Sequence, residues 1–294
     1  MLDQNDRPQN DRPQNDRPSG SGGDNNAASD DMLFDREEKP SSGGTLGKWR
    51  AGVAAPPGGG RRAPLWRRIL VFLLKWGAIA TVAFLVLSVS LVFIFGWTGP
   101  PPTLNMAGKA MEGVEVRRTW VPLKEMSPHI VRAVIAAEDQ SFCTHDGFDR
   151  KEIQKALEAA ERGRDLRGAS TISQQTAKNV FLFNGGGWVR KGFEAYFTVL
   201  MEWMWSKPRI METYLNVAEW GDGIYGIEQA AQERFKVSAR DLTPRQAAAL
   251  AAVLPNPNRW RVDGNYASGR RGTQIQSLMA MVKRDALATC VVGP

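Results

Sequence analysis

The longest apolar stretch of the chain runs from Ile69 to Trp97, and Lys75 is its only charged residue. The 22 uncharged residues from Trp76 to Trp97 are enough for a helix to cross a hydrocarbon core of roughly 30 Å. Lys75 lies near the start, where its long side chain can extend to the lipid headgroups. A buried core helix is the alternative, but tryptophans at both ends and a basic flank favour a single transmembrane anchor over residues 66–97.

Basic residues cluster before this anchor. Residues 48–75 contain seven Lys or Arg and no acidic residue, and after the anchor no charge appears until Lys109. The positive-inside rule therefore predicts a cytoplasmic N-terminus and places everything after residue 100 outside. The apolar run is too long for a cleaved signal peptide, and about sixty residues precede it.

The N-terminal segment lacks the pattern of a folded domain. Gln-Asn-Asp-Arg-Pro occurs three times, at 4–8, 9–13 and 14–18, and residues 19–60 are rich in Gly, Ser, Asp and Pro. Such a composition cannot bury enough apolar surface to offset the entropy cost of ordering. We predict a disordered cytoplasmic tail over residues 1–60.

Beyond the anchor, apolar positions recur at helical spacing nearly throughout. Only Val114–Val121 resembles a strand, and Gln274–Leu287 is a last amphipathic segment. Helix starts are marked by N-cap residues with a following proline or with Glu or Gln three positions on, at Ser127-Pro128, Asp149 with Glu152, Thr171 with Gln174, Ser206 with Pro208, and Thr243-Pro244 with Gln246. We predict an all-α fold and, by size, one domain over residues 105–290.

Charge and rare residues narrow the chemistry. The net charge is +7, and the chain from residue 100 carries 26 basic and 21 acidic residues. A mildly basic domain suits a phosphate, a nucleic acid or a membrane surface, and charge alone does not choose among them. His129, His145 and the two cysteines lack metal-ligand spacing, so we expect no zinc site. A disulfide between Cys143 and Cys290 suits an extracytoplasmic domain, but the sequence leaves it open.

The first group of polar residues that interrupts the helical pattern is Glu138-Asp139. Glu138 lies four residues after Val134 and eight after Ile130, close to the apolar face of its helix. A carboxylate turned toward an interior loses hydration, which raises its pKa and suits it to general acid or base catalysis. A charged turn exposed to water is the alternative interpretation.

Two further groups follow. Hydroxyl, amide and lysine side chains form a stripe at helical spacing, namely Thr171, Gln174, Gln175 and Lys178. Together with the free N–H groups of a helix start, this stripe suits an anion or a sugar, and a capped surface helix is the alternative. In the third group, Arg190 and Lys191 precede Glu194. The i,i+4 spacing of Arg190 and Glu194 indicates either a surface ion pair or a pyrophosphate clamp beside a carboxylate.

In this order and spacing, these groups resemble the monofunctional biosynthetic peptidoglycan transglycosylases (glycosyltransferase family 51), whose catalytic module also occurs in bifunctional penicillin-binding proteins. The resemblance covers roughly residues 105–290. It rests on the motifs EDxxFxxHxG (Glu138, Asp139, Phe142, His145, Gly147), GxSTIxQQxxKN (Gly168 to Asn179), RKxxE (Arg190, Lys191, Glu194), Tyr214-Leu215-Asn216, and Gly221-Asp222-Gly223 with Tyr225-Gly226-Ile227-Glu228. Several motifs in register make the match highly specific.

The resemblance implies a lysozyme-like helical fold with a second, membrane-touching lobe that polymerises lipid II into β-1,4-linked glycan strands for cell wall biosynthesis. Glu138 would act as general base and remove the proton of the acceptor's GlcNAc 4-hydroxyl. That oxygen would attack C1 of the donor MurNAc from the face opposite its undecaprenyl pyrophosphate, which inverts C1. Stabilising so highly charged a leaving group is mainly an electrostatic task.

The same resemblance assigns the remaining site residues. Lys178, Arg190 and Lys191 would stabilise the pyrophosphate, and Glu194 would be a second catalytic carboxylate, beside the leaving group or orienting the basic residues. Thr171 and Gln175 would hold the donor, within a substrate-binding set that also includes Ser170 and Gln174. The set is completed by residues that shape the site around Glu138, namely Asp139, Phe142 and His145, the histidine in a structural role.

One position departs from the family pattern. Many relatives carry an arginine eight residues after the motif lysine, where this chain has Gly186 in the run Gly185-Gly186-Gly187. Either Arg190 and Lys191 suffice, or a divalent cation, Mg²⁺ or Mn²⁺, takes up charge at the pyrophosphate; no other cofactor is implied. Because glycine is conformationally free, we expect a mobile loop and weaker donor binding. On this reasoning, Gly186→Arg lowers the apparent KM.

The expected partners are lipid II, the growing glycan strand, membrane lipids, and cell wall synthesis or division proteins, at the inner membrane with the domain in the periplasm. Nucleic acid matches the charge but not an outside-facing domain. A lysozyme-type hydrolase or lytic transglycosylase needs no basic cluster, and a non-catalytic scaffold would not need Glu138. The chain has no Ser-x-x-Lys, so we expect no transpeptidase activity.

Overall fold

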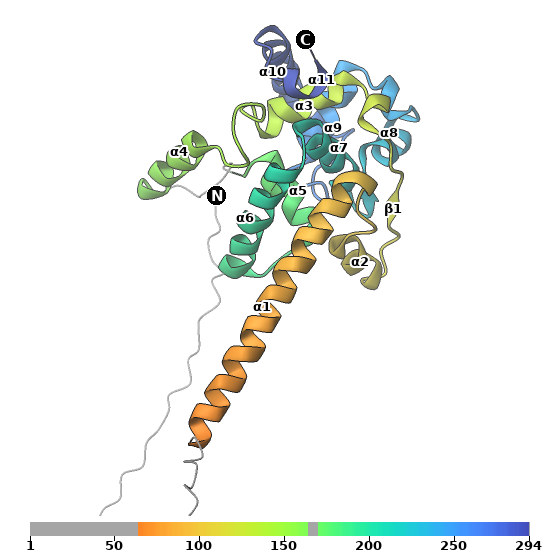
Figure 1. The fold of residues 1–294 in the computed structure, drawn as a ribbon. Coiled ribbons are helices and arrows are strands. Elements are labelled where there is room, and N and C mark those ends of the chain that lie inside the picture. The colour runs from red at the N-terminus through yellow and green to blue at the C-terminus, as the bar shows by residue number, and fades with distance from the viewer. Residues whose placement is uncertain (1–63, 164–169, 294) are drawn as a thin grey trace, which may run out of the picture. The chain divides into compact units, whose positions relative to one another are not determined.

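The computed structural model describes residues 64–163 and 170–293, and the predicted tail over residues 1–60 lies outside them. Helices dominate the described chain (Figure 1), which confirms the predicted fold class. They are α1 (Leu65–Thr98), α2 (Leu104–Met111), α3 (Pro128–Glu138), α4 (Arg150–Glu161), α5 (Ile172–Phe181), α6 (Gly187–Met204), α7 (Lys207–Val217), α8 (Ile227–Phe235), α9 (Pro244–Val253), α10 (Arg271–Arg284) and α11 (Thr289–Val292).

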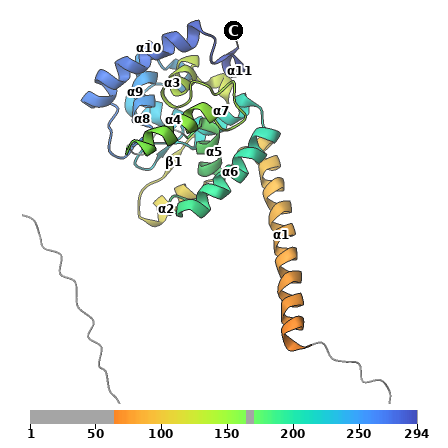
Figure 2. The ribbon, with the colours of Figure 1, turned by 90° about the vertical axis from the view of Figure 1, so that its left-hand side faces the viewer.

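The apolar stretch forms α1, an unbroken helix of 34 residues. Among the described residues it is the one helix long and apolar enough to cross a membrane, and only 11% of its most apolar window is buried. The alternative of a buried core helix is therefore wrong. Figure 2 shows α1 extending away from the body of the domain.

The C-terminal third of α1 is attached to the domain by hydrogen bonds. Ser88 Oγ lies 2.7 Å from the hydroxyl of Tyr196 on α6. Trp205 donates its indole N–H to the Val92 carbonyl at 2.8 Å, and Arg209 donates to the Phe95 carbonyl at 2.6 Å. The domain is thus fixed to the end of the anchor.

Helix starts follow the predicted capping signals. Ser127, Ser206 and Thr243 are N-caps of α3, α7 and α9, each with a proline in the first turn. Complete capping boxes occur at Thr171 and Thr243. At Asp149 the box prediction is only half right: the side chain accepts two backbone N–H groups of α4, but Glu152 pairs with Lys155 instead of returning a bond.

The strand prediction needs a correction. Only Arg117–Arg118 of the expected Val114–Val121 segment is a strand, β1, and it belongs to a sheet of order β1-β3-β2. Its partners, β2 (Glu219–Gly221) and β3 (Ile224–Tyr225), were not predicted. Strands of two or three residues are too short to show the alternation by which strands are recognised.

The core joins two groups of helices. In one, α3 packs against α9 and α10, and α9 is buried all round from Ala247 to Val253. In the other, α5 packs against α6 and α7. The C-terminal end of α3 meets the N-terminal end of α5, where Ile172 donates its N–H to Asp139 at 3.0 Å. The sequence motifs converge at this junction.

Candidate active site

Glu138 is the last residue of α3, and its carboxylate lies at the junction of the two helix groups. Gln175 on α5 donates its side-chain amide to Glu138 Oε2 at 2.9 Å, and the Tyr214 hydroxyl donates to Gln175 at 3.3 Å. Burial raises the pKa of Glu138, although the bond from Gln175 and the charge of Arg271 oppose the shift. The raised pKa predicted from helical spacing is confirmed, and the water-exposed turn is wrong.

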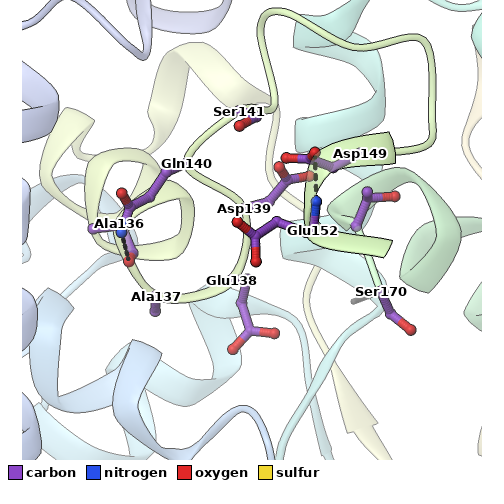
Figure 3. Close-up of a pocket in the computed structure, with 10 residues that line it drawn as sticks. Ala136, Ala137, Glu138, Asp139, Gln140, Ser141, Asp149, Glu152 and Ser170 are labelled. Atoms are coloured by element: carbon purple, nitrogen blue, oxygen red, sulfur yellow. Dashed lines mark hydrogen bonds between the residues drawn. The ribbon is translucent and has the colours of Figure 1, made fainter. Parts of the chain in front are cut away.

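One polar cavity is lined by this carboxylate, and a second lies beyond its hydrogen-bond partner Gln175. The first, of about 260 Å³, is lined by Glu138, Asp149, Glu152, Ser170 and Thr171, among others. Figure 3 shows the Glu138 and Glu152 side chains and the Ser170 hydroxyl around this space. The second, of about 180 Å³, includes Gln175 and Lys178 and thus begins where Gln175 contacts Glu138. A substrate with two polar portions therefore has room beside one base.

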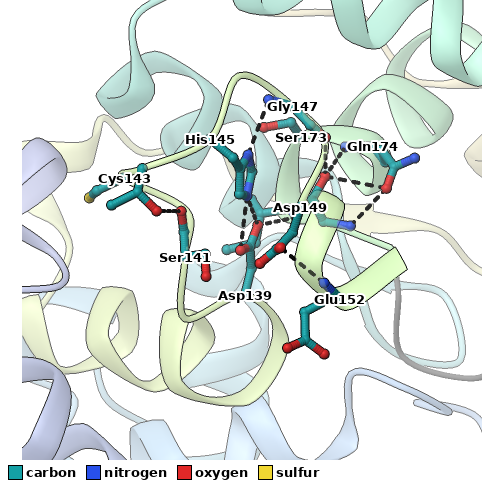
Figure 4. A network of polar contacts seen from close by, with 12 residues as sticks. Asp139, Ser141, Cys143, His145, Gly147, Asp149, Glu152, Ser173 and Gln174 are labelled. Carbon is teal, nitrogen blue, oxygen red and sulfur yellow. Dashed lines mark hydrogen bonds and ion pairs between the residues drawn. The ribbon is translucent and has the colours of Figure 1, made fainter. Parts of the chain in front are cut away.

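The loop after α3 is held by a network around Asp139 (Figure 4). His145 Nε2 lies 3.0 Å from both Asp139 oxygens, and Gly147 donates its N–H to His145 Nδ1 at 3.1 Å. Phe142 is fully buried in the core. Lys207 donates to the His145 carbonyl at 2.6 Å and lies over the Phe142 ring. Asp139, Phe142 and His145 thus fix the loop beside Glu138. Both ring nitrogens of His145 are engaged within the loop, by Asp139 and by the Gly147 N–H.

The predicted polar stripe on α5 divides in two. Thr171 and Gln174 cap the helix and are buried, and the Thr171 hydroxyl donates to the Gly147 carbonyl at 2.7 Å. Of the four stripe residues, Gln175 and Lys178 line the second cavity. The polar groups of Thr171 and Gln174 therefore serve the helix cap. The alternative of a capped surface helix is wrong, because most of α5 is buried.

The basic residues converge on Glu194, which is only 3% exposed. Arg190 donates to Glu194 Oε2 at 2.7 Å, and Lys191 contacts the other oxygen. Lys191 also reaches the Ser170 hydroxyl at 3.4 Å. Burial lowers the pKa of Lys178, and the charge of Glu194 opposes this shift. Because Glu194 is buried, the alternative of an exposed surface ion pair is wrong. One carboxylate contacts both Arg190 and Lys191 and so fixes the positions of the two cations.

The glycine run at the start of α6 has a specific backbone role. Gly185, Gly186 and Gly187 all have positive φ angles, of 103°, 85° and 55°. A Cβ on Gly186 would lie 2.9 Å from the Cβ of Arg190. A side chain there is strained by both its φ angle and its neighbour, which contradicts the expectation that Gly186→Arg simply restores a missing contact.

A disulfide joins Cys143, in the loop after α3, to Cys290 in α11. Their Cα atoms are 5.6 Å apart and 147 positions separate them in sequence. The pairing left open by the sequence is therefore present. It attaches the loop that carries Asp139 and His145 to the C-terminal end of the domain.

Several residues around the site were missed by sequence reasoning. Arg271, at the start of α10, is near enough to Glu138 to lower its pKa. Asn105 and Glu219 line the second cavity from α2 and β2. The Arg270-Arg271 pair before the last amphipathic segment was a visible signal, whereas Asn105 and Glu219 stand in no recognisable spacing. No group of three or more His, Cys, Asp or Glu suited to a metal ion occurs within residues 64–163 and 170–293.

Comparison with known proteins identifies the class. The family model described as transglycosylase matches residues 106–281, which include every predicted site residue from Glu138 to Glu194. The chain belongs to the transglycosylase family.

Its relatives carry a more particular name, biosynthetic peptidoglycan transglycosylase. The one from Rhodospirillum centenum is 47% identical over 224 residues, which cover 76% of this chain and 97% of the relative. The one from Caulobacter vibrioides is 51% identical over 202 residues, covering 68% and 88%. The one from Xanthomonas axonopodis pv. citri is 43% identical over 245 residues, covering 81% and 93%.

Proposed function

We propose that this transglycosylase polymerises the glycan strands of peptidoglycan with lipid II as both donor and acceptor, and that it inverts the configuration at C1 of the donor. The observation that carries the proposal is that Lys178 lies close to the half-buried Glu138 carboxylate and also to Arg190 and Lys191, which are held by Glu194. A glycosidase has no need of such a cluster, whereas a phosphate-bearing leaving group requires it.

Glu138 acts as the general base in this proposal. Its raised pKa brings the carboxylate closer to the pH at which it operates, which favours proton transfer from a sugar hydroxyl. The hydrogen bond from Gln175 fixes one oxygen, Oε2. Glu138 takes the proton of the acceptor 4-hydroxyl as the new C1–O bond forms and the C1–O bond to the pyrophosphate breaks.

The departing pyrophosphate is stabilised by the basic cluster. Glu194 holds Arg190 and Lys191 in place from a buried position, so the cations need little reorganisation when charge develops. Lys178 extends from the adjoining helix and lines the second cavity. Mg²⁺ or Mn²⁺ at the pyrophosphate remains a proposal, and its ligands would include the pyrophosphate oxygens.

A lipid-linked substrate requires a site close to the membrane. Apolar side chains on α6 are exposed, with Trp188 at 88% and Trp203 at 79%, and Phe193 contacts Phe84 of the anchor. Exposed apolar area next to a membrane-length helix suits insertion among lipids. A cytoplasmic N-terminus and a periplasmic domain at the inner membrane are supported by the basic flank of α1 and by the disulfide, since disulfides persist in oxidising compartments.

The test is polymerisation of labelled lipid II by the full chain in detergent, with wild type compared with Glu138→Gln. We expect polymer from wild type and a loss of about 10²- to 10⁴-fold in the variant, the usual contribution of a general base. Glu152→Gln is the matched control, because Glu152 lines the same cavity but pairs with Lys155. Equal activity in Glu138→Gln would refute the assignment of the base, and lipid II binding without polymer in wild type would favour a scaffold.

A further inference from the structure

Glu219 is a half-buried carboxylate that the mechanism above does not use. It is the first residue of β2, pairs with Tyr225 of β3 and lines the second cavity. Its Oε1 atom is buried and has no hydrogen-bond partner in the described part of the chain. Burial raises the pKa of this carboxyl, while Lys109, the Gly223 amide and Asn258 oppose the shift.

Leaving a buried oxygen without a partner is costly for the folded protein. The charge of Lys109 favours the ionised form of Glu219, but the ammonium makes its hydrogen bond to Asp222, at 2.9 Å, and not to Oε1. The Gly223 amide and the Asn258 side chain favour the ionised form of Glu219, but Oε1 itself has no partner among the described residues. An unpartnered buried oxygen such as Glu219 Oε1 is explained if it accepts a hydrogen bond from a bound substrate.

The second cavity has the lining expected of a carbohydrate site. Besides Glu219 and apolar residues such as Val217 and Leu254, the lining contains four amides, a lysine and two phenols: Asn105, Gln175, Asn179, Asn184, Lys178, Tyr214 and Tyr225. Amides and carboxylates are matched to the hydroxyl and acetamido groups of an amino sugar, because they donate and accept hydrogen bonds in fixed directions. Through Gln175, the cavity is directly connected to Glu138.

We propose that Glu219 is a substrate-binding residue whose Oε1 accepts a hydrogen bond from an N–H or O–H group of an amino-sugar unit held in the second cavity. The inference rests on the proposed function and adds to it a residue that sets affinity for the sugar. Glu219 and Glu138 then contact the substrate on two sides of Gln175, one carboxylate for binding and the other for proton transfer.

The experiment compares Glu219→Leu and Glu219→Gln with wild type in lipid II polymerisation and in thermal melting of the full chain in detergent. We expect Glu219→Leu to raise the KM for lipid II about tenfold or more with little change in kcat, the usual effect of losing a hydrogen bond to a charged group. Glu219→Gln keeps an acceptor oxygen and should recover part of the loss. Because Oε1 is unpartnered without substrate, the melting temperature of Glu219→Leu should be equal to or above that of wild type.

Asp222→Asn is the matched control: it removes a carboxylate from the same β2–β3 turn, but one that lies outside the cavity, and its KM should not change. An unchanged KM in Glu219→Leu, or a lowered melting temperature with a parallel loss of kcat, would overturn the inference in favour of a structural role. Lipid II affinity measured in the Glu138→Gln background keeps this test separate from the proposed function. There, equal affinity with and without Glu219→Leu overturns the Glu219 inference alone, and weaker affinity supports it even if wild type makes no polymer.

Discussion

The disulfide between Cys143 and Cys290 gives the most direct quantitative prediction. Replacing both cysteines by serine frees a loop of about 147 residues in the unfolded chain. The chain-entropy relation assigns that constraint about 17 cal/mol/K, or about 5 kcal/mol at 25 °C, and removal of native disulfides typically costs about 2–5 kcal/mol. For a domain of this size, each 1 kcal/mol moves the melting temperature by about 2–4 °C, so we expect a fall of roughly 5–20 °C.

The loss should appear in stability and not in the catalytic step. The loop is also held by the His145 contact with Asp139, by Lys207 on the His145 carbonyl and by Thr171 on the Gly147 carbonyl. Well below the melting temperature, the double variant should therefore polymerise lipid II at a rate close to that of wild type.

The assay is thermal melting of the full chain in detergent, followed by the fluorescence of its 10 tryptophans, with and without a reducing agent. Reductant should lower the midpoint of wild type to that of the double variant and leave the double variant itself unchanged. A wild-type midpoint that is insensitive to complete reduction, or a double variant as stable as wild type, would refute the reasoning.

Two further outcomes follow from the site. Gly186→Arg should raise the KM and lower the melting temperature, and Gly186→Ala should cost about 1–2 kcal/mol because of the positive φ angle. Gly192→Ala, whose added Cβ meets no atom within 4 Å, is the control expected to keep stability, and a lower KM in Gly186→Arg would contradict the prediction. Because burial raises the pKa of Glu138 above its unfolded value, ionisation opposes folding as pH rises through that window. Glu138→Gln should therefore melt above wild type at pH 7 and lose this advantage in acid, where both side chains are neutral; equal melting at pH 7 would argue against the raised pKa.

Local chemistry explains what the sequence predicted well. N-caps and N1 prolines act within one helical turn, so Ser127, Thr171, Ser206 and Thr243 were found at the starts of helices as expected. Glu138 was recognised because its burial follows from helical spacing along α3 alone.

What the sequence did not predict depends on contacts between distant segments. Glu219 becomes half-buried only when β2 pairs with β3 and Asn105 of α2 lies at the same cavity. The spacing of apolar residues along the sequence does not indicate such contacts. The requirement for positive φ at Gly186 arises from how the chain enters α6 against Arg190. Whether Cys143 meets Cys290 depends on the packing of α11 against α3 and α7, which no spacing in the sequence encodes.

The contacts between α1 and the domain join the two without a flexible connection. The helix is about 51 Å long, and its last turns are bonded to α6, to Trp205 and to Arg209 without an intervening linker. An enzyme on a loose tether would sample many heights and tilts above the bilayer. In this chain the contacts of Ser88, Val92 and Phe95 join the domain directly to the end of α1, so the orientation of α1 and the orientation of the domain are coupled.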